Sequence, residues 1–61
     1  MKQYWIVTKG QEADDIYGGQ YPVCLDTEEV ERLSKEWDRN LFDVMHEATD
    51  KEIEQYGKYD S

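Results

Sequence analysis

The segment from His46 to Asp50 reads HEATD, and its residue types come nearest in this chain to a catalytic motif. In the zinc motif HExxH, two histidines four residues apart on one helix face hold the metal, and the glutamate activates a water molecule. Here aspartate stands in place of the second histidine, and His46 is the only histidine of the chain. We therefore expect no protease chemistry from this segment.

A weaker metal site is an alternative interpretation of the same region. Asp43, His46 and Asp50 are separated by three and four residues, so a continuous helix would place them on one face. Such a face binds a divalent ion loosely at best. The competing interpretation, a solvated polar face, is favoured because Thr49 is a helix-cap residue and the chain is too short for a substrate cleft.

Nucleophilic and cofactor chemistry are also not predicted. Cys24 lies in an apolar run beside Asp26, whose negative charge would raise the thiol pKa, so a small buried hydrophobic residue is expected. Gly10, Gly18 and Gly19 fit no phosphate-binding loop. The sequence thus predicts a protein that is not an enzyme, with no catalytic residue, no metal and no cofactor.

The lone cysteine also bears on location. A single cysteine excludes a disulfide within the chain and is typical of a reducing compartment. The apolar run near the N-terminus, residues 4–8, is too short for a signal peptide or a membrane span. These features predict a cytoplasmic protein.

The charge of the chain is its strongest compositional feature. Fifteen acidic residues stand against seven basic ones, which gives a net charge of −8 in 61 residues. Such a surface repels nucleic acid and anionic membranes and attracts basic surfaces. The expected partner is therefore a basic protein surface, and neither direct nucleic-acid binding nor membrane binding is expected.

Acidic residues recur every seven positions from Glu29 through Glu36 and Asp43 to Asp50, which on one helix would form an acidic stripe. Phe42 lies away from the apolar stripe and is a candidate apolar anchor. The alternatives are a charged face that only keeps the protein soluble and, for Phe42, packing inside the protein or in a homodimer. The predicted partner-binding residues are Glu29, Glu36, Phe42, Asp43 and Glu47.

The elements that must position these residues fall into two halves. Residues 1–25 hold the β-forming segments, which predict a two- or three-stranded antiparallel sheet over about 3–8, 15–17 and 20–25. Both faces of 4–8 are largely apolar, so this strand should be covered on both sides. The Gly18-Gly19 pair predicts a hairpin turn, and Pro22 predicts an edge strand after it.

The second half is helical in pattern. Apolar residues recur every three or four positions from Val30 to Ala48, which predicts a long helix over about 27–48 that begins at an Asp26 cap. Residues 38–40 are a weak point where this helix could kink or split. Thr49 and Glu52 form a capping box, which predicts a short helix over about 50–56 that ends at Gly57.

Together these patterns predict one small α+β domain spanning 1–61, in which the sheet packs on the long helix. The predicted function is a small acidic non-enzymatic protein-binding module. Its size and acidity are similar to those of phage or mobile-element proteins, which include inhibitors of nucleic-acid-binding proteins such as nucleases. The alternatives are a small structural homo-oligomer and a weak metal-binding protein that uses Asp43, His46 and Asp50.

Overall fold

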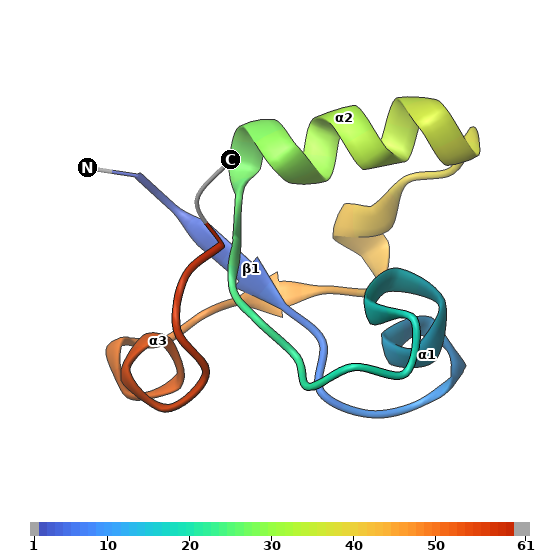
Figure 1. Ribbon diagram of the computed structural model, residues 1–61. Coiled ribbons are helices and arrows are strands. Elements are labelled where there is room, and N and C mark those ends of the chain that lie inside the picture. Colours follow the sequence, from blue (N-terminus) through green and yellow to red (C-terminus); the bar gives the residue numbers. More distant parts are fainter. Residues whose placement is uncertain (1, 60–61) are drawn as a thin grey trace.

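The computed structural model describes residues 2–59 and has an α+β fold (Figure 1). Its sheet has three strands in the order β2-β1-β3, and both strand pairs are antiparallel. The predicted class, with a small antiparallel sheet, a long helix and a short C-terminal helix, is confirmed. The elements are β1 (Tyr4–Ile6), α1 (Gln11–Tyr17), β2 (Leu25–Asp26), α2 (Thr27–Trp37), the 3₁₀ helix η1 (Leu41–Asp43), β3 (His46–Glu47) and α3 (Asp50–Tyr56). The predicted single domain over 1–61 includes residues 1, 60 and 61, which lie outside the described part.

Strand β1 is the central strand, and both of its faces are covered, as the apolar residues on both faces predict. On one face, Val7 and the β2 residue Leu25 join Val30, Leu41 and Met45 in the main core beneath α2. Ile6 points to the opposite face because successive side chains of a strand alternate, and it is fully buried. Figure 1 shows α2 on one side of β1 and α3 on the other.

Residues 15–17 form the last turn of α1, so the predicted second strand and its hairpin are wrong. Ala13, Ile16 and Tyr17 pack against the core with helical spacing, which a strand of the same residues could not achieve. Gly18 has a φ of 61° and ends the helix in the left-handed conformation that glycine adopts without steric cost. The glycine pair thus terminates a helix instead of joining two strands.

The predicted strand over 20–25 is also shorter than expected, because only Leu25–Asp26 pairs with β1. The residue before it, Cys24, pairs with the segment that follows α3. The Cys24 N–H donates to the Gly57 carbonyl at 3.0 Å, and the Tyr59 N–H donates to the Cys24 carbonyl at 2.9 Å. The C-terminal segment therefore runs beside β2 as a parallel bridge, which nothing in the local sequence pattern indicates.

Helix α2 ends at Trp37, so the prediction of one helix over 27–48 is wrong beyond that residue. The break falls at the predicted weak point. Asp38 has a φ of 52°, in the left-handed region, and turns the chain away from the helix axis. The chain then returns through η1, where the Leu41 N–H donates to Ser34 Oγ at 3.1 Å and the Leu41 side chain is fully buried. The apolar spacing persists because both segments face the same core.

The predicted starts of α2 and α3 are confirmed. The Asp26 carboxylate caps α2 by accepting from the Glu29 N–H at 2.8 Å. Thr49 Oγ1 accepts from the Glu52 N–H at 3.2 Å, and the Glu52 carboxylate accepts from the Thr49 N–H at 3.0 Å. This reciprocal capping box satisfies donors that a helix N-terminus leaves free, and it fixes where α3 begins.

Candidate functional site

Exposed carboxylates occur on helices α1, α2 and α3, on η1 and on β3. Ten of them lie on exposed residues: Asp14, Asp15, Glu28, Glu31, Glu36, Asp38, Asp43, Glu47, Asp50 and Glu54. Within residues 2–59, Glu36 is the only one of these ten that forms an ion pair. The negative charge of the sequence therefore remains largely uncompensated at the surface.

Three of these carboxylates follow one another along consecutive elements, and we call Asp43, Glu47 and Asp50 the acidic edge. Asp43 ends η1, Glu47 lies in β3 at one edge of the sheet, and Asp50 begins α3. A chain advances at most about 3.6 Å per residue, so the Glu47 Cα lies within about 11 Å of the Asp50 Cα and about 14 Å of the Asp43 Cα. The three carboxylates are thus neighbours along the chain, one on each of η1, β3 and α3.

Glu29, a predicted partner-binding residue, is buried, with 8% of its surface exposed. Its carboxylate accepts two hydrogen bonds from the Arg32 guanidinium, one of them from Nε at 3.0 Å. The Arg32 hydrogen bond lowers the pKa of Glu29 below its ordinary value. Glu29 therefore holds a turn of α2 together, and its burial makes it the least accessible of the predicted partner-binding residues.

Glu36 and Phe42, two further predicted contact residues, lie in different surroundings. Glu36 is exposed on α2 and pairs with Arg32 at 3.6 Å, between groups that are both largely solvated. Phe42 is half-buried against the core, and its ring meets the ring of Trp5 edge to face with centroids 5.0 Å apart. Phe42 is thus a packing residue, which leaves Glu36, Asp43 and Glu47 as the exposed predicted contacts.

The acidic stripe predicted along one helix does not exist as a helix face, because α2 ends before Asp43. For the same reason Asp43, His46 and Asp50 lie on three different elements, and the helix face proposed for a metal ion is wrong. Among residues 2–59, no three His, Cys, Asp or Glu side chains gather in a way that would hold a metal ion.

His46 instead lies in β3 and contacts α3. Its Nε2 is 2.8 Å from Glu52 Oε2. The Thr49 N–H and then the His46 side chain lower the pKa of Glu52, so its carboxylate stays ionised beneath the acidic edge. The next residue of β3, Glu47, contacts the N-terminal segment of the chain, where Gln3 Nε2 donates to Glu47 Oε2 at 3.1 Å. These two contacts link β3 to Gln3, the residue before β1, and to α3.

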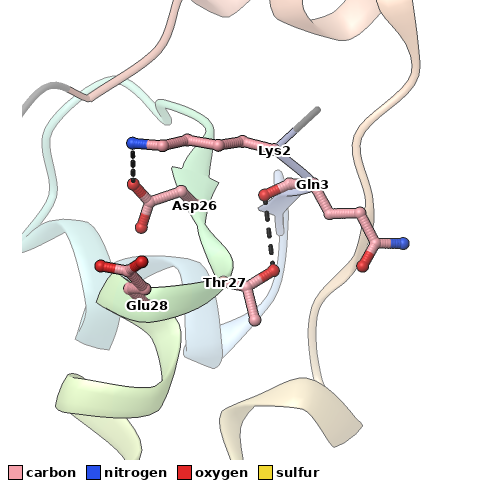
Figure 2. A pocket seen from close by; sticks show the side chains of 5 residues that line it. All are labelled: Lys2, Gln3, Asp26, Thr27 and Glu28. Atoms are coloured by element: carbon pink, nitrogen blue, oxygen red, sulfur yellow. Dashed lines mark hydrogen bonds and ion pairs between the residues drawn. The ribbon is translucent and has the colours of Figure 1, made fainter.

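A shallow pocket of about 330 Å³ lies at the start of α2, lined by Lys2, Gln3, Asp26, Thr27 and Glu28 (Figure 2). Lys2 reaches across it to Asp26 at 3.6 Å. Thr27 Oγ1 accepts from Trp5 Nε1 at 3.0 Å and lies 3.5 Å from the Gln3 carbonyl, to which it donates. The polar groups of this pocket thus hold β1 against the start of α2.

Cys24 is fully buried, as its apolar surroundings predict. Burial, with a smaller contribution from the Glu52 charge, raises the pKa of its thiol. A buried thiol with a raised pKa is a poor nucleophile, so Cys24 acts as a packing residue.

The sequence pattern does not predict a contact between the exposed Tyr21 and the half-buried Tyr56. Tyr21, in the loop after α1, has 71% of its surface exposed, and its ring lies 5.4 Å from the ring of Tyr56 at the end of α3. The two residues are far apart in the chain, so no local periodicity relates them. The parallel pairing of Cys24 with the C-terminal segment brings them together.

Comparisons of the chain with protein-family models, with curated proteins and with solved structures gave no match. Across residues 2–59, no helix has both the length and the apolar character needed to cross a membrane. Function must therefore be argued from the surface of the molecule itself.

Proposed function

We propose that this protein is a small acidic non-enzymatic module that binds a basic surface of a partner protein. The observation that carries the proposal is the set of exposed carboxylates that, within residues 2–59, have no cation beside them apart from Arg32 next to Glu36. Uncompensated charge of one sign raises the association rate with a surface of the opposite sign and selects against like-charged partners.

The acidic edge is the part of this surface best suited to make the contact. Asp43, Glu47 and Asp50 are exposed on short elements that are anchored to the core by Leu41, Met45 and the α3 capping box. Charges held on a rigid support lose little side-chain and backbone freedom on binding. Glu36, on α2, is a second exposed carboxylate among the predicted contacts.

A basic surface that binds this protein is also the kind of surface that binds nucleic acid. Nucleic-acid-binding proteins present clustered lysine and arginine to phosphates, and an acidic protein competes for the same cations. The protein is therefore proposed to act as an inhibitor of a nucleic-acid-binding protein in the cytoplasm. Its size and acidity support an origin in a phage or mobile element.

The test uses a short oligo-arginine peptide as the basic probe and measures its affinity for the full-length protein by calorimetry. The variant Asp43→Asn, Glu47→Gln, Asp50→Asn removes the charges of the acidic edge. We expect binding about tenfold weaker than for the unaltered chain, because each solvated ion pair contributes about 0.2–1 kcal/mol. Far-ultraviolet circular dichroism establishes that the variant is folded.

The matched control carries the same change in net charge at Asp14, Asp15 and Glu54, which are exposed on α1 and on α3 beyond its first turn. We expect this control to lose less affinity than the acidic-edge variant. Equal losses would mean that the acidity acts only through net charge and would contradict a docking site. Affinity that does not fall between about 0.01 M and about 1 M salt would contradict the electrostatic proposal itself.

A further inference from the structure

The exposed Tyr21, packed against the half-buried Tyr56, offers a second kind of contact to a basic partner. Tyr21 is the most exposed of the large hydrophobic side chains in residues 2–59, and its ring is tilted by 40° against that of Tyr56. Tyrosine is enriched at binding surfaces because one rigid ring supplies large contact area together with a polar group. We call these two residues the tyrosine pair.

The surroundings of the tyrosine pair favour a cation as its occupant. The loop that carries Tyr21, residues 18–23, contains no charged residue, so nothing in it repels a cation. Glu52 lies one helical turn before Tyr56 on the same face of α3, and its pKa is lowered. The Glu52 carboxylate itself is held by the Thr49 N–H and by His46 at the start of α3, so the attraction for a cation comes from the net charge of −8.

The same end of the chain already places a cation on a tyrosine ring. Lys58 Nζ lies 5.4 Å from the ring centroid of Tyr4, within the range of a cation–π interaction. Lys58 follows Tyr56 by two residues and is held by the bridge to Cys24. Lys58 thus contacts Tyr4, while Tyr21 is largely exposed.

We propose that the tyrosine pair binds an arginine side chain of the basic partner. The guanidinium of this arginine stacks on the ring of Tyr21. This inference rests on the proposed function, because it names the aromatic part of the same binding event. Arginine is favoured over lysine because its planar guanidinium stacks on aromatic faces and is more weakly hydrated. Tyr59, the other exposed tyrosine, lies near Arg32, which already supplies a cation there.

The test compares Tyr21→Leu with Tyr21→Phe in the titration with oligo-arginine. Leucine keeps an apolar side chain but removes the ring, and phenylalanine keeps the ring. An exposed cation–π contact corresponds to about a two- to fivefold change in affinity, so Tyr21→Leu should bind about two- to fivefold more weakly. Tyr21→Phe and the control Tyr59→Leu should bind as the unaltered chain does.

The outcomes separate this inference from the proposed function. If Tyr21→Leu binds like the unaltered chain while the acidic-edge variant binds more weakly, the tyrosine pair is not part of the site and the acidic module stands. If Tyr21→Leu weakens binding while the acidic-edge variant and added salt have no effect, the tyrosine pair stands and the electrostatic function falls. No binding of oligo-arginine by the unaltered chain overturns both, and equal weakening by Tyr21→Leu and Tyr59→Leu overturns the assignment to Tyr21.

Discussion

Glu29 and Arg32 form a two-pronged ion pair one turn apart on α2, and Glu29 is the one buried charged residue in residues 2–59. The pair explains why an acidic residue lies on the core side of the helix. Arg32 neutralises a carboxylate that would otherwise lose its hydration without compensation. Because its carboxylate is bound to Arg32, Glu29 is not one of the charges that are free to bind a partner.

The pair predicts a specific dependence of stability on pH. The folded-state pKa of Glu29 lies below its ordinary value of 4.5, so the stabilisation is complete above that value and is lost as the pH falls through the lowered pKa. Glu29→Gln removes this titration, so its free energy of unfolding should fall less steeply below pH 4.5. Urea unfolding at a series of pH values measures the slope. An unchanged slope in Glu29→Gln would contradict the contribution of the ion pair to stability.

The capping box of α3 predicts the cost of losing Thr49. Thr49→Ala leaves the Glu52 N–H without its side-chain acceptor and should lower the free energy of unfolding by about 1 kcal/mol. That is a large part of the roughly 3–5 kcal/mol that a core of this size supplies. Thr49→Ser keeps the hydroxyl and serves as the control in urea unfolding. Equal stability of the alanine variant and the unaltered chain would contradict the assigned cap.

The left-handed conformation of Asp38 predicts that glycine is tolerated there. A residue with a side chain is disfavoured in this region by roughly 1–2 kcal/mol, whereas glycine is not. Glycine also adds about 0.5–1 kcal/mol of conformational entropy to the unfolded chain, so Asp38→Gly should be neutral or stabilise the fold by up to about 1 kcal/mol. Thermal unfolding measures the change. Asp38→Val should destabilise the fold, and a more stable valine variant would contradict the backbone geometry.

The contact between Phe42 and Trp5 predicts an effect on stability without an effect on binding. Phe42→Leu keeps an apolar side chain but removes the edge-to-face ring contact, which is worth about 1 kcal/mol. Chemical unfolding should show this loss, while the affinity for oligo-arginine stays unchanged. A folded Phe42→Leu variant with lower affinity would restore Phe42 as an anchor for the partner.

How far the sequence predicts the fold depends on whether the signal is local. The starts of α2 and α3 follow from caps between residues three positions apart, and the end of α3 follows from Gly57. The structure has all three as predicted. The prediction of a strand at 15–17 is wrong because a glycine with positive φ, such as Gly18, can end a helix as well as form a hairpin turn. The end of α2 is missed because Leu41 returns to the same core from a different element.

The candidate site was less predictable than the fold, because it depends on contacts between distant segments. Asp43 and Glu47 are exposed as predicted, yet they belong to η1 and β3 instead of one helix face. The burial of Glu29 depends on how α2 packs, and the Tyr21–Tyr56 contact depends on the bridge at Cys24. No spacing in the sequence encodes these relationships.

The central claim, that the acidic edge binds basic protein surfaces, is tested most directly by mapping the bound probe on the protein. Oligo-arginine is titrated into the isotopically labelled protein while the backbone amide resonances are followed by nuclear magnetic resonance. We predict the largest shifts at Asp43, Glu47 and Asp50, with smaller ones at the equally exposed Asp14 and Asp15 of α1. Shifts of equal size in α1 and along the acidic edge would contradict the claim and leave the acidity without a docking role.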